Sequence, residues 1–118
     1  MLGARPGGVP HGDIAVDSSG LVQAATGGMS VFDDPQQLPK HRKPAWLAGG
    51  EGRDPLFHIR LTSLTNHVDR LPVALAVRYD GLRGHAVVEP ATTCPFVAYM
   101  AALCLTRASW LEVQCHPN

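Results

Sequence analysis

The chain has 118 residues, and its ten basic and ten acidic side chains cancel to a formal net charge of zero. This length fits one domain, residues 1–118, with a single hydrophobic core, and a neutral surface lacks the field that recruits nucleic acid or an anionic membrane. No stretch reaches the ~18 apolar residues of a membrane helix, and residues 1–8 lack the apolar run of a signal peptide. We therefore expect a cytoplasmic protein without a membrane segment, delivered into a target cell, if at all, without a signal peptide.

The first half of the chain favours short strands separated by turns. Residues 3–12 hold four glycines and two prolines, which predicts irregular backbone. Apolar runs bounded by turn residues predict three strands, at 14–16, 21–24 and 29–32. The turn Thr26-Gly27-Gly28 is one where the backbone can take positive φ. A polar stretch then runs to Pro44, and residues 45–55 form a Gly-rich loop; loops this long inside a compact domain tend to be functional.

The middle of the chain predicts a strand and then a hairpin. In the strand, residues 56–61, alternation places His58 and Arg60 opposite the cleaner apolar face, so these side chains should point outward or into a cleft. The hairpin has a strand over 73–79, a loop over 80–84 and a return strand over 85–89. That loop length sets Leu75 opposite Glu89.

One helix is predicted, over residues 96–106, with Thr93 or Cys94 as its cap and Pro95 in its first turn. Apolar side chains lie nearly all round it, which predicts a buried helix. Residues 110–113 predict a last turn or a short strand. The expected fold class is therefore α+β, built mainly from antiparallel strands, with one buried helix near the C-terminus.

Cysteine and histidine spacing favours neither a disulfide framework nor a metal site. The three cysteines are odd in number and none forms a Cys-x-x-Cys pair, so free thiols are expected. The six histidines include no helical i, i+4 pair and no Cys/His cluster, so we expect no metal. Two alternatives stay open: His41 and His85 as an acid–base pair, and Cys94 as a thiol whose pKa is lowered beside a helix start.

Glu89 is the acidic residue with a structural reason to do chemistry. In the expected register one face of the hairpin consists of Leu75, Val77, Tyr79, His85, Val87 and Glu89. A carboxylate at the end of an apolar face is costly to bury without partners, and such groups are enriched in active sites. The alternative is that Pro90 ends the strand and Glu89 turns out to water.

Two further segments could bind a ligand. In the segment from Thr26 to Ser30, two glycines let a ligand approach the backbone and both terminal residues offer hydroxyls; the alternative is an ordinary turn before a strand. The run Lys40-His41-Arg42-Lys43, joined by Arg53, can bind a phosphate or pyrophosphate by charge and forked hydrogen bonds; the alternative is a solvated loop. The run is too short for a strong nucleic-acid footprint.

One segment, Thr26-Gly27-Gly28-Met29-Ser30-Val31-Phe32-Asp33, resembles a known toxin sequence. It is similar to the Thr-Gly-Gly-x-Ser-Val-Phe-Asp segment of small toxins that type VI secretion systems deliver and that have an ADP-ribosyltransferase-like fold. Its context is similar as well: the turn at 17–20 precedes it, and Leu38-Pro39-x-His41-Arg42-x-Pro44 and Gly49-Gly50-x-Gly52-x-Asp54-Pro55 follow. The resemblance covers residues 9–110, and its specific part is the eight-residue segment.

This resemblance implies a split pair of small antiparallel sheets that clasp NAD in the cleft between them. It implies that Ser30 lines the cleft and that Glu89 orients the nicotinamide ribose and stabilises oxocarbenium-like charge as the glycosidic bond breaks, so these two are the expected catalytic residues. The expected contacts with NAD are Arg5, His11, Thr26, Gly27, Gly28, Arg42 and Arg53. The resemblance also implies an immunity protein as partner and a macromolecular target.

The sequence departs from this family at two places. The family usually has an Arg or His on a first strand, but only Arg5 and His11 are available, and residues 1–8 do not predict a strand. Arg5 would then act from an edge segment, or the NAD site would be reduced. Position 87 is valine, where the family has the first acid of a Glu-x-Glu or Gln-x-Glu pair, which argues against arginine-directed transfer by the usual arrangement.

The expected function is an NAD-dependent toxin or effector that cleaves NAD and transfers ADP-ribose to a macromolecule. Two alternatives stay open. One is a non-enzymatic interaction module, which the neutral charge and the long Gly/Pro loops suit. The other is a small metal-free ribonuclease toxin that uses His41 or His85. Titration with NAD tests the first alternative, and RNA cleavage in the presence of a chelator tests the second.

Overall fold

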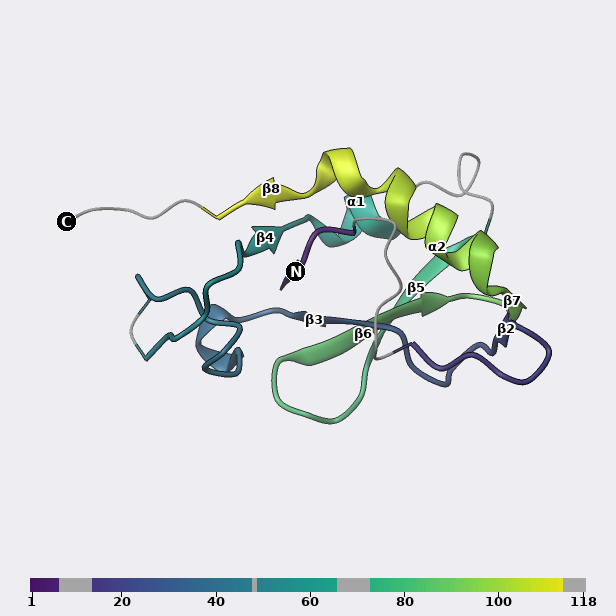
Figure 1. Cartoon of the computed structure of the whole chain (residues 1–118), viewed down its shortest axis with the longest axis horizontal. Helices are drawn as coiled ribbons and strands as arrows, with labels where there is room; N and C mark the ends of the chain where they lie inside the picture. Colours follow the sequence, from purple (N-terminus) through teal and green to yellow (C-terminus); the bar gives the residue numbers. More distant parts are fainter. Residues whose placement is uncertain (7–13, 48, 66–72, 114–118) are drawn as a thin grey trace.

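The computed structural model describes residues 1–6, 14–47, 49–65 and 73–113. They form a six-stranded sheet in the order β5-β6-β3-β1-β4-β8, a two-stranded sheet β2-β7 and one main helix, α2 (Figure 1). The strands are β1 Leu2–Gly3, β2 Leu21–Val22, β3 Met29–Phe32, β4 Phe57–His58, β5 Leu75–Tyr79, β6 His85–Pro90, β7 Cys94–Pro95 and β8 Leu111–Glu112. The helices are α1 Leu61–Thr65 and α2 Phe96–Leu105, with 3-10 turns η1 Pro35–Gln37 and η2 Arg107–Ser109. These strands all pair antiparallel, so the predicted α+β class is confirmed.

The six-stranded sheet consists of two halves that are joined narrowly at its centre. In one half, β6 pairs with β3 from Met29↔Val88 to Phe32↔His85, and with β5 on its other side. In the other half, β4 pairs with both β1 and β8. Among the described residues, β1 meets β3 at the pair Leu2↔Phe32. The halves β5-β6-β3 and β1-β4-β8 can therefore diverge on either side of this junction.

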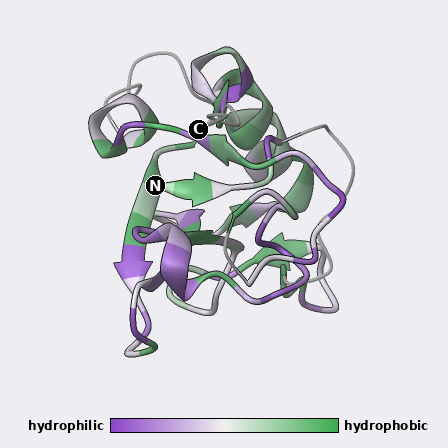
Figure 2. Cartoon of the chain, turned by 90° about the vertical axis from the view of Figure 1, so that its left-hand side faces the viewer, coloured by the Kyte–Doolittle hydropathy of each residue, from purple (hydrophilic) through white to green (hydrophobic). Residues whose placement is uncertain are grey.

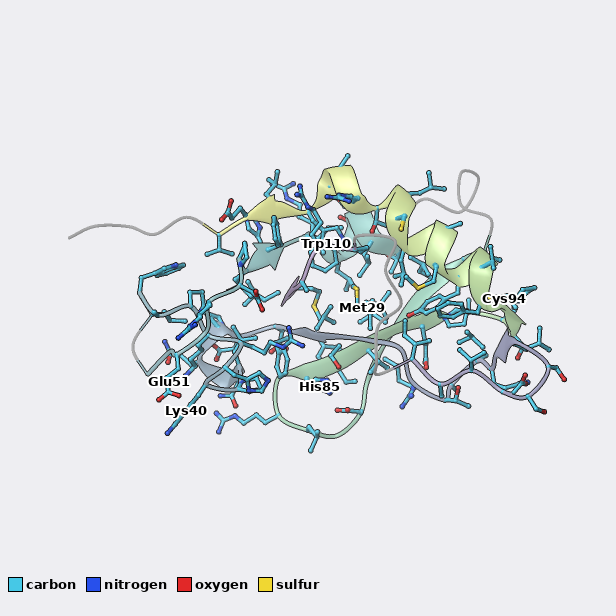
Figure 3. The ribbon with its side chains drawn as sticks, in the orientation of Figure 1. Met29, Lys40, Glu51, His85, Cys94 and Trp110 are labelled. Atoms are coloured by element: carbon cyan, nitrogen blue, oxygen red, sulfur yellow. The ribbon has the colours of Figure 1, made fainter. Side chains whose placement is uncertain are left out.

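The alternation of β3 decides which face of the sheet is the core. Met29 and Val31 are buried, whereas Ser30 and Phe32 on the opposite face are half-buried. Met29 lies between the sheet and the C-terminal segment that carries Trp110 (Figure 3), and both side chains belong to the main hydrophobic cluster. Figure 2 shows the central strands coloured mainly as hydrophobic, with hydrophilic residues in the connecting segments. The outer face of β3 is thus left for a site.

Tyr99 ties α2 to the junction between β3 and β6. Its hydroxyl donates to the carbonyl of Val88 and accepts from the backbone N–H of Met29 at 3.1 Å. Gly28 makes room for this contact, because a Cβ at that position would lie 2.7 Å from the Tyr99 hydroxyl and would collide with the Val88 carbonyl. Packing against Tyr99 and Val88 therefore explains why position 28 is a glycine.

The helix α2 is buried on one face only, so the prediction of burial all round is wrong. Tyr99 and Leu103 are fully buried, but Val97 and Leu105 are 77% and 59% exposed. The helix packs on the sheet through one stripe, and its opposite stripe is apolar without being covered. The predicted cap is also wrong, because Pro95 occupies the cap position and no side chain caps the helix. No helix among the described residues is long and apolar enough to cross a membrane.

Three further strand predictions need correction. Residues 14–16 have no strand structure. Residues 56–61 form a strand only at Phe57–His58, and Leu61 begins α1. The predicted apolar face is therefore wrong at both ends, because Leu56 is buried and Leu61 is exposed. His58 and Arg60 are exposed, as predicted. Leu2–Gly3, where no strand was predicted, lies at the centre of the sheet.

The hairpin exists as predicted, but its register differs by one residue. Leu75 pairs with Pro90 and Ala76 with Glu89, rather than Leu75 with Glu89. The cause is a longer turn: Asp80 accepts from the backbone N–H of Leu82 at 3.1 Å, and its other oxygen lies 2.5 Å from Nδ1 of His85. A shift of one residue moves every side chain to the other face of a strand. Glu89 therefore shares a face with Ala76 rather than with Leu75.

Candidate functional site

A cavity of about 560 Å³ opens at the junction of the two sheet halves. This volume lies within the range of small-molecule sites. We call this cavity the cleft. Four segments line it: residues 3–5 at the end of β1, the strand β3, the loop residues 38–42, and residues 54–57 at the start of β4. The segments are far apart in the sequence and meet here because β1 inserts between β3 and β4. The wall combines aromatic rings with cations.

Arg5 lies two residues after β1, a strand inside the sheet, and lines the cleft. Its guanidinium carbon lies 4.7 Å from the centroid of the Phe57 ring. Phe57 faces Gly3 in the neighbouring strand, so the pairing of β1 with β4 positions this stack. A guanidinium that stacks on a ring keeps its N–H donors at its edges, where they can meet an anion.

The loop from Pro39 to Arg53 is closed on itself by backbone hydrogen bonds. The N–H groups of Arg42 and Lys43 donate to the Pro39 carbonyl at 2.9 Å, and the N–H of Glu51 donates to the Lys40 carbonyl at 2.9 Å. Lys40 and Glu51 accordingly lie in the same part of the molecule in Figure 3. Gly52 bridges to Pro44 in this loop. The bonding holds His41 and Arg42 at the cleft as parts of a fixed wall.

Glu89 is buried, with an exposure of 4%, and it is well partnered. The Arg78 Nε donates to its Oε1 at 2.8 Å, and the Arg78 Nη2 and the Gly27 N–H donate to its Oε2, each at 3.3 Å. The hydrogen bond and the charge of Glu89 raise the pKa of Arg78. The alternative in which Glu89 turns out to water is therefore wrong.

The position of Glu89 relative to the cleft follows from the register. Ser30 pairs with Val87, so Ser30 and Glu89 lie on the same face of the sheet as diagonal neighbours, about 7–8 Å apart. Ser30 lines the cleft, but Glu89 does not appear among its lining residues. The carboxylate of the cleft wall is Asp54, which the sequence did not single out.

The other expected NAD contacts that the structure describes do not line the cleft. Thr26 is exposed and donates to the Gln23 carbonyl at 2.7 Å. Gly27 has the positive φ that the turn predicted, +117°, and Gly28 packs under Tyr99. Arg53 lines a second, smaller cavity. His11 lies outside the described residues.

The histidine and cysteine alternatives receive little support from the geometry. His41 lines the cleft, whereas His85 pairs with Asp80, and its ring centroid lies 4.9 Å from that of Phe32. The two histidines are therefore not among the lining residues of one cavity. Burial raises the pKa of Cys94, which is opposite to the lowered value considered from the sequence.

The described part of the chain also shows the state of two cysteines and the arrangement of the side chains that could ligate a metal. Cys94 and Cys104 are free thiols, and Cys115 lies outside the described residues. No group of three or more His, Cys, Asp or Glu side chains within that part is placed to hold a metal ion.

The sequence reasoning found Arg5, Ser30 and Arg42 but missed the ring of Phe57 and the carboxylate of Asp54. One signal was available for Asp54, because the long Gly-rich loop that ends there was flagged as functional. No local sequence signal indicates Phe57, because its place in the cleft depends on pairing with β1.

Comparisons of the chain with known protein families, curated proteins and solved structures found no match.

Proposed function

We propose that the cleft binds NAD and that the protein cleaves the bond between nicotinamide and ribose, with transfer of ADP-ribose to a macromolecular target. One observation carries this proposal: Arg5, Ser30 and Arg42, three expected site residues from distant segments, line one cavity between the two halves of the sheet. The toxin resemblance implies a cleft between two sheets, and here the cleft lies at the junction within one six-stranded sheet.

The charges and rings of the cleft suit a dinucleotide. Arg5 and Arg42 offer forked, charge-assisted hydrogen bonds to the pyrophosphate. Phe32 and Phe57 supply apolar walls against which a nicotinamide ring can pack. Ser30, on the outer face of β3, also lines the cleft, where its side chain would meet the ribose.

Glu89 is the acid of the proposal. When the C1′–N bond breaks, nicotinamide leaves with the bonding electrons and positive charge develops on the ribose. A carboxylate one diagonal step from Ser30 stabilises that charge, and water or an acceptor then adds at C1′ and releases a proton. Arg78 keeps Glu89 oriented, and Asp54 in the cleft wall is the rival carboxylate.

A cell-based measurement tests the proposed activity. The chain is expressed in bacteria from an inducible promoter, and free NAD is measured as growth slows. The proposal predicts that NAD falls with the wild-type protein and with Arg83→Gln, a control in the exposed hairpin turn. It predicts a much smaller fall with Arg5→Gln and Arg42→Gln at equal protein levels. Unchanged NAD with the wild-type protein would contradict it.

The proposal extends to location and partner. An NAD-cleaving toxin acts in the cytoplasm of its target cell, and a cell that produces it needs an immunity protein. We propose that this partner inhibits the enzyme. Co-expression with a neighbouring gene product that restores both growth and NAD tests this part.

A further inference from the structure

A second cavity of about 260 Å³ lies beside the cleft and shares part of its wall. Asp54, Pro55 and Leu56 line both cavities, so a ligand in the second cavity is a direct neighbour of one in the cleft. The other walls come from the loop around Trp46, from Arg53 and from β8, which contributes Glu112. We call this second cavity the side pocket.

Trp46 gives the side pocket an aromatic face. Its side chain is 44% exposed, whereas Trp110 in the core is 2% exposed. The segment is held in place, because the N–H of Leu47 donates to the Pro44 carbonyl at 3.0 Å and the N–H of Gly50 donates to the Leu47 carbonyl at 2.8 Å. A large ring that is half-open to solvent and lies beside these backbone hydrogen bonds offers a face on which a planar group can stack.

The charges of the side pocket decide which planar group fits. Among its described lining residues, Asp54 and Glu112 are carboxylates and Arg53 is a cation, so the balance is one negative charge. A guanidinium can stack on an indole face and at the same time donate forked hydrogen bonds to a carboxylate. A phosphate would meet two carboxylates for one cation, and a neutral base could donate hydrogen bonds to the carboxylates but would lack the attraction between opposite charges.

We propose that the side pocket binds the guanidinium group of an arginine side chain on a partner or target protein. The group stacks on Trp46 and donates to Asp54 at the edge of the cleft. This role differs from the pyrophosphate contact expected for Arg53, because Arg53 here repels the ligand rather than holding it. The binding does not depend on NAD, so it can hold or fail independently of the proposed activity.

The experiment titrates isotope-labelled protein with a short peptide that contains one arginine, and amide chemical shifts report binding. A peptide with citrulline in place of arginine is the matched probe, because it keeps the shape and loses the charge. Trp46→Ala and Asp54→Asn should each weaken binding roughly two- to fivefold, the effect of one exposed cation–π contact or ion pair. Glu51→Gln is the control for Asp54→Asn, since Glu51 is exposed and lines neither cavity.

Arg53→Gln gives the sharpest result, because the sign of its effect depends on the ligand. The proposal predicts that Arg53→Gln binds the arginine peptide more tightly than the wild type does, with chemical-shift changes at Trp46. It also predicts that Arg53→Gln binds the citrulline peptide more weakly than it binds the arginine peptide. Arg83→Gln should change nothing. The proposal is overturned by equal binding of both peptides, by absent binding, or by weaker arginine binding in Arg53→Gln. Adenosine monophosphate that shifts the amide of Trp46, which lines the side pocket and not the cleft, more strongly than the peptide does would also overturn it.

Discussion

Arg78 on β5 donates to Glu89 on β6 at 2.8 Å, and the carboxylate in turn accepts the backbone N–H of Gly27. This buried acid therefore fixes the turn that leads into β3, the strand that carries Ser30. Because the carboxylate has these partners, removing its charge should cost stability as well as activity.

Glu89→Gln should lose about 10²–10³ in the rate of nicotinamide release, the usual cost of removing a main electrostatic stabiliser. It should also lower the free energy of unfolding by about 1–2 kcal/mol, because hydrogen bonds to a charged group are lost while Arg78 remains partly solvated. Chemical denaturation and a nicotinamide assay measure the two effects. Glu51→Gln is the surface control. A folded Glu89→Gln enzyme as active as that control would refute the assignment.

Arg78→Gln separates the two roles of Glu89. If Glu89 acts on the ribose, Arg78→Gln should lower the stability, because it leaves a buried carboxylate without its cation, but should reduce the rate much less than Glu89→Gln does. If Asp54 is the acid instead, Asp54→Asn should give the larger loss of rate. The ranking of the three rates, each corrected for the folded fraction, decides between them.

Gly28→Val should destabilise the fold rather than report on a ligand. Its Cβ would collide with the Val88 carbonyl and crowd the Tyr99 hydroxyl, and overpacking of this kind costs about 1–3 kcal/mol or more. Gly27→Ala is the comparison, because a Cβ there meets nothing within 4 Å and the cost, about 1–2 kcal/mol, comes from its positive φ. Thermal unfolding followed by circular dichroism measures both. A Gly28→Val protein as stable as the wild type would contradict the packing.

Tyr99→Phe should cost about 1–3 kcal/mol, because the Met29 N–H and the Val88 carbonyl lose a shared partner inside the core. Amide hydrogen exchange should speed up at Met29 in particular. Unchanged protection at Met29 would show that the hydroxyl bridge contributes nothing.

The turn of the hairpin should make stability depend on acid pH. Burial pushes the pKa of Asp80 up, but the Leu82 N–H and the His85 ring outweigh it, so the pKa lies below its ordinary value. A carboxylate with a lowered folded pKa stabilises the fold above its unfolded pKa, and this contribution is lost as the pH falls below about 4. The melting temperature of the wild type should therefore approach that of Asp80→Asn between pH 5 and 2.5. A constant difference over that range would contradict the pairing.

The sequence predicted the elements that have local signals. The strand at 29–32 follows a glycine turn and is followed by Asp33-Asp34-Pro35, and both boundaries are as expected. The hairpin was predicted from the apolar runs on either side of its glycines. Its register was not predictable from the sequence, because the contact between Asp80 and His85 lengthens the turn between β5 and β6 by one residue.

The elements that were missed depend on distant partners. Leu2–Gly3 is too short to show alternation and becomes a strand because β3 and β4 flank it. No element was predicted for residues 62–65, yet Leu61–Thr65 form α1, whose five residues give only the single apolar pair Leu61 and Leu64 as a helical signal. Phe57 was missed for the same reason, because its place in the cleft depends on pairing with β1, whereas Asp54 lies in the Gly-rich loop 45–55 that was expected to be functional. Arg5 was named only because the toxin resemblance calls for an upstream Arg or His.

The central claim is that the cleft between the sheet halves binds NAD, and calorimetric titration of the purified protein with NAD tests it most directly. We predict saturable heat with the wild type, and affinity reduced roughly 10- to 100-fold in Arg5→Gln and Arg42→Gln, the effect of losing a charged hydrogen bond to a phosphate. Arg83→Gln should bind as the wild type does. No heat with the folded wild type, or equal affinity in all the variants, would contradict the claim and favour a non-enzymatic interaction module.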